Sequence, residues 1–126
     1  MEHKILIVDD EPHIRMLIEQ TLEELEDDGV EFLTAENGEI ALQIIQKENP
    51  QLVFLDVMMP KMNGMEVCRK IKKELQLKDV FIVLLTAKGQ ELDRQKGYEV
   101  GADIYMTKPF DPEAILSKAK EVLGLK

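Results

Sequence analysis

The sequence is poor in cysteine and in positive charge. Its single cysteine, Cys68, excludes an internal disulfide and is typical of a reducing compartment. There are 16 Lys and Arg residues against 25 Asp and Glu, which gives a formal net charge of −9. Binding to DNA phosphates or to an anionic membrane surface needs clustered Lys and Arg, so neither is expected as a direct partner.

Long apolar runs are also missing. No run approaches the length that spans a membrane, and no signal peptide opens the chain, so we expect a cytoplasmic protein. The sequence contains no linker, repeat or low-complexity stretch, and 126 residues suit one sizeable core. We therefore expect a single domain over residues 1–126, with any separate output domain lying outside this chain.

Short apolar segments alternate with amphipathic segments along the whole chain. Strands are predicted at 4–8, 30–35, 52–55, 80–85 and 104–107, and the apolar spacing predicts helices over about 12–25, 38–48, 65–75, 90–100 and 112–123. The apolar face of the first helix is expected to consist of Ile14, Leu17, Ile18, Leu22 and Leu25. Five strands alternating with five helices predict a flavodoxin-like α/β fold, a doubly wound parallel sheet in the order 2-1-3-4-5.

Polar residues follow four of these strands at the point where each strand ends. Asp9 and Asp10 follow the first strand, Asp56 the third, Thr86 the fourth and Lys108 the fifth. Parallel strands joined by right-handed crossovers present their carboxyl ends at one edge of the sheet. In the order 2-1-3-4-5 the crevice lies between the first and third strands, so the three aspartates are expected to converge there.

Three carboxylates that converge in this way repel one another. At about 5 Å and an effective dielectric constant near 20, each pair costs roughly 3 kcal/mol. A Mg²⁺ ion relieves this repulsion and suits a shallow site of carboxylates, a carbonyl and water. Lys108 adds a cation and Thr86 a hydroxyl, so the set predicts a site where an oxygen of Asp56 attacks a phosphoryl group.

Each of these residues also has an ordinary structural interpretation. Asp56 starts a turn, Asp10 suits the cap of a helix, Thr86 is a common strand-end residue, and Lys-Pro is a common pair. Only their placement together at one edge of the sheet favours a functional site over these structural roles.

Five motifs occur in order along the chain: Ile7-Val8-Asp9-Asp10-Glu11, Phe54-Leu55-Asp56-Val57-Met58-Met59-Pro60, Asn63-Gly64, Leu85-Thr86-Ala87, and Gly101-Ala102-Asp103 through Lys108-Pro109-Phe110. They resemble the CheY-like receiver domain of bacterial-type two-component response regulators, and the resemblance spans essentially the full chain. It implies a signalling switch, rather than an enzyme acting on an external substrate. A histidine kinase or phosphotransfer protein would phosphorylate the domain, which would then act on a downstream protein target that the sequence does not identify.

The resemblance also implies a role for each site residue. Asp56 would accept the phosphoryl group, and Asp9, Asp10, Asp56 and the backbone carbonyl of Met58 would hold Mg²⁺. Lys108 would pair with the phosphoryl group, and its peptide bond to Pro109 would be cis. Thr86 and Tyr105 would act as the switch. Thr86 would swing toward the phosphoryl oxygen, and Tyr105 would rotate inward into the space that Thr86 leaves. The surface formed by the fourth helix, fifth strand and fifth helix would change, and Gly97 would loosen the fourth helix for this shift. A buried core tyrosine is the alternative for Tyr105.

Two positions that vary in this family bear on the lifetime of the modified state. Met58 offers no polar side chain to position an attacking water, and Lys88 places a cation at the mouth of the site. We therefore expect self-dephosphorylation to be slower than in relatives with amide or acidic groups at these positions.

Considered without the resemblance, the residues leave three other functions to be weighed. A phosphoryl-aspartate hydrolase would need a second aspartate at the position of Met58, and a flavin carrier would need a phosphate loop in place of Asp9-Asp10-Glu11. A degenerate receiver that only binds partners is the third alternative.

Several residues are expected to be structural. His3 and His13 are expected at the surface, and Cys68 is expected to be buried on a helix. The basic cluster of Arg69, Lys70, Lys72 and Lys73 is interpreted as a solvated helix face.

Overall fold

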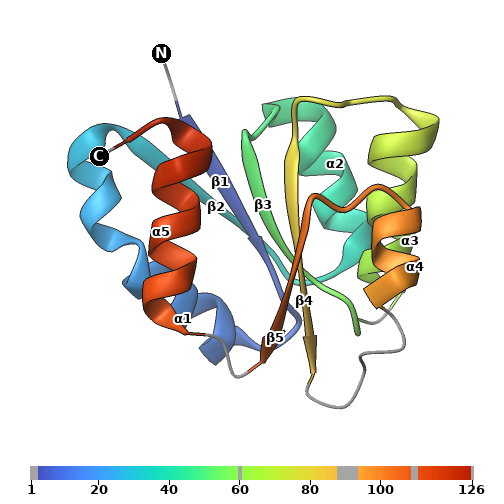
Figure 1. Ribbon diagram of the computed structural model, residues 1–126, viewed down its shortest axis with the longest axis horizontal. Coiled ribbons are helices and arrows are strands. Elements are labelled where there is room, and N and C mark those ends of the chain that lie inside the picture. The colour runs from blue at the N-terminus through green and yellow to red at the C-terminus, as the bar shows by residue number, and fades with distance from the viewer. Residues whose placement is uncertain (1–2, 60, 88–93, 109–110, 126) are drawn as a thin grey trace.

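The computed structural model describes residues 3–59, 61–87, 94–108 and 111–125 (Figure 1). Its five-stranded sheet has the order β2-β1-β3-β4-β5, and all four neighbouring pairs are parallel. The strands are β1 His3–Val8, β2 Val30–Ala35, β3 Leu52–Asp56, β4 Phe81–Ala87 and β5 Ile104–Lys108. The predicted doubly wound sheet and its strand order are confirmed.

Helices cover both faces of the sheet. Helices α1 Pro12–Thr21 and α5 Pro112–Leu123 lie on one face, and α2 Gly38–Glu48, α3 Gly64–Arg69 and α4 Arg94–Glu99 lie on the other (Figure 1). Alternate residues of the central strands feed two buried clusters: Val53 and Leu55 lie in one, and Leu52 and Phe54 in the other. Burial on both faces explains why these strands appear in the sequence as unbroken apolar runs. Among the described residues, no helix has both the length and the apolar character needed to cross a bilayer.

The first predicted helix is wrong over its last four residues, 22–25. Helix α1 ends at Thr21, and a 3₁₀ helix, η1 Glu23–Asp28, follows it and ends at Gly29 with φ +82°. Leu22 and Leu25 are buried as expected. Leu17 is 45% exposed, because α1 buries the row that contains Ile18 and a residue one position away points about 100° around the helix.

The third predicted helix is right in extent but not in type. Helix α3 is regular only to Arg69, and η2 Lys70–Glu74 is a π-helical segment. The amide of Leu75 donates to the carbonyl of Lys70, five residues earlier, over 2.8 Å. Apolar periodicity does not distinguish this from an α-helical turn.

The described part of the fourth helix begins at Arg94, so residues 90–93 of that prediction lie outside the described residues. Gly97 lies inside α4 as expected. The fourth strand starts one residue later than predicted and continues through Thr86 to Ala87. The polar residue predicted to end this strand is therefore part of it.

Candidate functional site

Three aspartates meet at the carboxyl edge of the sheet. Asp9 and Asp10 follow β1, and Asp56 is the last residue of β3, the strand paired with β1. One carboxylate oxygen from each of the three lies within 4.8 Å of the others. Asp9 and Asp56 are buried, whereas Asp10 is exposed. The predicted convergence at the point where the strand order reverses is confirmed.

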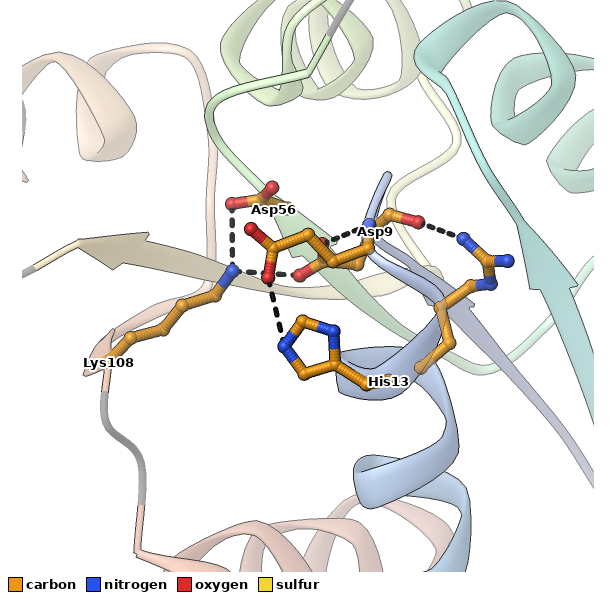
Figure 2. Close-up of polar contacts among 6 residues, drawn as sticks. Asp9, His13, Asp56 and Lys108 are labelled. Carbon is orange, nitrogen blue, oxygen red and sulfur yellow. Dashed lines mark hydrogen bonds and ion pairs between the residues drawn. The ribbon is translucent and has the colours of Figure 1, made fainter.

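Asp9 is held by hydrogen bonds through its amide and both carboxylate oxygens. Its amide donates to the carbonyl of Ala35 at the end of β2, and its Oδ1 accepts from the amide of Glu11 over 2.9 Å. Its Oδ2 accepts from Nζ of Lys108 over 2.8 Å (Figure 2). A fully buried carboxylate needs such partners, because an unpaired buried charge costs several kcal/mol. The Asp9 side chain is therefore fixed in position.

Lys108 joins the two buried carboxylates. It is the last residue of β5, and its Nζ lies 2.8 Å from Oδ2 of Asp9 and 3.3 Å from Oδ1 of Asp56 (Figure 2). Burial works against its charged form, but the hydrogen bond to Asp9 and the two negative charges outweigh it and raise the pKa of Lys108. The ammonium group is therefore charged at neutral pH and lies beside the Asp56 carboxylate.

The carboxyl group of Asp56 holds its proton more tightly than an ordinary aspartate. Burial, followed by the negative charge of Asp9, raises its pKa from 3.8 to about 6, although Lys108 acts in the opposite direction. At pH 7 roughly nine in ten molecules carry the ionised form. A carboxylate that is ionised but poorly solvated is suited to act as a nucleophile.

The exposed aspartate is positioned only through its backbone. Among the described residues, the Asp10 side chain has no hydrogen-bond or ion-pair partner. The peptide that leads into it carries the carbonyl of Asp9, and this oxygen accepts from Nη1 of Arg15 over 2.6 Å (Figure 2). Arg15 was not among the residues predicted from the sequence to belong to the site. Helical side chains lean toward the helix N-terminus, so an Arg in the first turn of α1 was the available signal.

The loop that follows Asp56 is held by backbone contacts. The amide of Val57 donates to the carbonyl of Leu85, and the amide of Gly64 donates to the carbonyl of Val57, both over 2.9 Å. A Cβ at Gly64 would overlap the carbonyl oxygen of Asp56, and a Cβ at Gly38 would overlap that of Met62. Only glycine allows these approaches. The loop is thereby pressed between α3 and the start of α2.

The predicted switch residues lie on β4 and β5. Thr86 is buried and lies opposite Thr107 in the register of the two strands. Tyr105 is also buried, and its ring centroid lies 6.4 Å from that of Tyr98 on α4. The side chain of Tyr105 already belongs to the core in this structure.

Other predictions have mixed outcomes. His13 is exposed, with Nε2 3.3 Å from a carboxylate oxygen of Glu11 (Figure 2), but His3 is only partly exposed and its Nδ1 is buried. His3 was predicted at the surface; it begins β1 and is partly covered there. Cys68 is buried, and burial raises the pKa of its thiol to about 12, so the structural prediction is confirmed. Lys88 and the peptide joining Lys108 to Pro109 lie outside the described residues.

The basic cluster of the third helix is largely paired. Arg69 and Lys70 contact Glu74, and Lys72 lies 3.0 Å from a carboxylate oxygen of Asp103. These pairs support the interpretation as a helix face.

A hollow of about 430 Å³ lies at the other edge of the sheet, against the last turns of α5. Its lining includes Gln51 before β3, Phe81 at the start of β4, and Lys118 and Glu121 of α5. None of the site carboxylates lines it, so the shallow acidic crevice and this hollow are separate features.

The acidic crevice fits a small divalent cation. Three carboxylates within 4.8 Å supply only hard oxygen ligands, two buried and one open to water. Mg²⁺ prefers this combination because it retains several waters. Nitrogen or sulfur ligands, which softer metals prefer, are absent from this described cluster.

Comparison with known proteins agrees with this geometry. Residues 5–120 match the family described as the response regulator receiver domain. The chain is 48% identical over 122 residues to the probable transcriptional regulator ycf27 of Porphyra purpurea, covering 97% of this chain and 48% of that protein. It is 44% identical over 124 residues to the alkaline phosphatase synthesis transcriptional regulatory protein PhoP of Bacillus subtilis, covering 98% of this chain and 49% of that protein. This chain therefore spans about half the length of these curated relatives.

Solved structures lead to the same conclusion. The BeF3-activated DrrB receiver domain has a TM-score of 0.84 at 37% identity, with 98% of this chain and 99% of that one covered. The chemotaxis response regulator CheY4 of Vibrio cholerae has a TM-score of 0.82 at 35% identity, with 97% and 99% covered. The chain belongs to the response regulator receiver domain family of two-component signalling proteins.

Proposed function

We propose that this receiver domain is switched by phosphorylation of Asp56 in a site that contains Mg²⁺. The observation that carries the proposal is the meeting of three carboxylates within 4.8 Å, with the ammonium of Lys108 between the two buried ones. The carboxylates alone would repel one another. A cation and a transferred phosphoryl group together account for the whole set.

Asp56 is the nucleophile in this proposal. With a pKa of about 6 it is mainly ionised at neutral pH, and it lies at the open end of β3. One of its oxygens attacks the phosphorus of a phosphohistidine, so a P–O bond forms while the P–N bond breaks. The imidazole leaves with the bonding electron pair and takes up a proton. The product is an acyl phosphate on Asp56.

Asp9, Asp10, Asp56 and the backbone carbonyl of Met58 would hold the metal. Bound Mg²⁺ would neutralise charge on the equatorial oxygens of the phosphoryl group during transfer. Lys108 would need to move little to form an ion pair with the phosphoryl group, because its Nζ is already 3.3 Å from Oδ1 of Asp56. The metal and Lys108 would then both supply positive charge beside the Asp56 carboxylate.

The switch would run through β4 and β5. Thr86 is buried beside the strand that carries Asp56, and its hydroxyl is the donor that would turn toward a new phosphoryl oxygen. Tyr105, on the next strand, would take the space released, and its contact with Tyr98 links it to α4. The surface of α4, β5 and α5 would then change for a downstream protein.

The phosphoryl donor in this proposal is a histidine kinase or a phosphotransfer protein. The support is the family and the curated relatives, which include PhoP of Bacillus subtilis. Those relatives are transcriptional regulators, and this chain matches about half of each. The output partner therefore stays unspecified, and the cell compartment is proposed to be the cytoplasm.

The direct test is mass spectrometry after incubation with Mg²⁺ and acetyl phosphate. The wild type should gain one phosphoryl group, and Asp56→Asn should gain none. Asp10→Ala and Lys108→Ala should react much more slowly, whereas Asp79→Asn, the same chemical change at the opposite edge of the sheet, should react normally. A wild type that gains no mass, or an Asp56→Asn variant that still does, refutes the proposal.

The competing functions have less support. A phosphoryl-aspartate hydrolase needs an acid–base aspartate two residues after the nucleophile, where Met58 presents an exposed thioether. A degenerate binding module would not need three carboxylates and a lysine converging on one point.

A further inference from the structure

We infer that Arg15 is a positioning residue for the metal site, acting through the backbone carbonyl of Asp9 to place the carboxylate of Asp10. The inference rests on the proposed function, because it concerns the same Mg²⁺ site. Arg15 touches neither Asp10 nor Asp56 in the contacts of the described residues, and it is not a catalytic residue.

The three carboxylates are held in place by different contacts. Asp9 is fixed through its amide and both carboxylate oxygens, and Asp56 is fixed by β3 pairing and by Lys108. Asp10 is exposed and its side chain has no partner in the described part of the chain. Its place therefore depends on the orientation of the peptide that precedes it.

Arg15 holds this peptide through its carbonyl oxygen. The carbonyl of Asp9 and the amide of Asp10 belong to one planar unit, so holding the oxygen sets the direction in which the chain enters Asp10. The hydrogen bond from Nη1 of Arg15 to this oxygen is 2.6 Å long, and its donor carries a full charge (Figure 2). Without it, the Asp9–Asp10 peptide loses this hydrogen bond and is freer to rotate.

Arg15 is part of helix α1 and is only partly exposed. It lies at the end of the first turn of α1, where its amide donates to the carbonyl of Glu11. Arg15 also lines a hollow of about 220 Å³ with Thr34 and Ala35 of β2 and with Ile40 of α2. Arg15 therefore lies where α1, β2 and α2 border the same hollow, beside the loop after β1.

Charge and positioning predict opposite effects on metal binding. Arg15 adds a positive charge near a cation site, so by charge alone its removal would strengthen Mg²⁺ binding. By positioning, its removal would weaken binding, because the metal would then have to order Asp10 as it binds. Loss of a group that orients a metal ligand commonly weakens affinity about tenfold or more. The sign of the change therefore distinguishes the two.

The experiment is a calorimetric titration of Mg²⁺ into the wild type, Arg15→Gln and Arg15→Lys. We expect Kd to rise about tenfold in Arg15→Gln and less in Arg15→Lys, which keeps the positive charge and can still donate a hydrogen bond. Arg69→Gln makes the same substitution on α3, remote from the carboxylates, and should leave Kd unchanged. At saturating Mg²⁺, the reaction with acetyl phosphate should recover in both Arg15 variants, since the bound metal then orders Asp10.

Unfolding with a chelator present separates positioning from folding, because a purely structural role lowers stability without changing Kd of the folded protein. Unchanged or tighter Mg²⁺ binding in folded Arg15→Gln overturns the inference, and if that variant fails to fold, Arg15→Lys is decisive in the same way. A wild type that binds no Mg²⁺ instead removes the proposed function, and the inference with it. A wild type that binds Mg²⁺ beside unaffected Arg15 variants removes the inference alone.

Discussion

Replacing Asp56 by Asn should make the metal-free fold more stable at pH 8 and change its stability little at pH 4. The side chain is buried beside Asp9, which raises its pKa from 3.8 to about 6. Because the folded chain binds this proton more tightly than the unfolded chain, protonation stabilises the fold. That stability is fully present below about pH 3.8 and is lost as the pH rises through about 6. Asn is neutral at every pH and avoids the loss.

The size of the effect follows from the shift in pKa. A difference of about two pKa units corresponds to about 3 kcal/mol at pH 8. Water at the open rim, where Asp10 is exposed, screens part of this energy, so we expect a gain of about 2 kcal/mol. For a chain of this length that is roughly 6 to 8 °C in Tm. The gain should fall to about half at pH 5.

The assay is urea unfolding of both proteins, with a chelator present to exclude metal. Asp79→Asn is the matched control, because it makes the same change on an exposed residue at the opposite edge and should alter stability by less than about 0.5 kcal/mol. Equal stability of Asp56→Asn and wild type at pH 8 would show that Asp56 is not strained by burial and by Asp9. A gain that is independent of pH would refute the linkage argument.

Three further results are expected. Mg²⁺ at ten times its Kd should stabilise the wild type by about 1.4 kcal/mol in a thermal scan, and the gain should disappear in Asp10→Ala at the same concentration. Gly64→Ala should cost about 3 kcal/mol in urea unfolding, because the new Cβ overlaps a backbone carbonyl, whereas Gly124→Ala, with nothing within 4 Å, should cost about 1 kcal/mol; similar losses would contradict the packing. Met58→Asn should shorten the phosphoryl lifetime roughly tenfold by positioning water, and an unchanged lifetime would count against slow self-dephosphorylation.

The site was predictable from sequence because strand ends carry a strong signal. Apolar runs that stop at Asp9, Asp56 and Lys108 locate the carboxyl edge of a parallel sheet, and right-handed crossovers bring these ends together. The distances between strands in a sheet then fix which side chains can meet. This is why the carboxylates and Lys108 converge as predicted.

What sequence reasoning missed depends on backbone groups that every residue shares. The carbonyl of Asp9 that Arg15 contacts looks like any other carbonyl in a sequence. The bond from Leu75 to Lys70 depends on how η2 fits its neighbours, not on apolar spacing. Leu17 is apolar and correctly spaced, but α1 has a narrower buried stripe than the number of its apolar residues suggested.

The two glycine contacts beside the site also determine where a disturbance can travel. The backbones of Gly38 and Gly64 lie so close to the carbonyls of Met62 and Asp56 that no Cβ would fit there. The α2 side of the crevice therefore has no room for an added group. Rotatable side chains stand on the other flank, where Thr86 and Tyr105 lie along β4 and β5. A bulky anion attached to Asp56 would therefore be accommodated by movement of β4 and β5 side chains. The α2 side of the crevice would stay rigid.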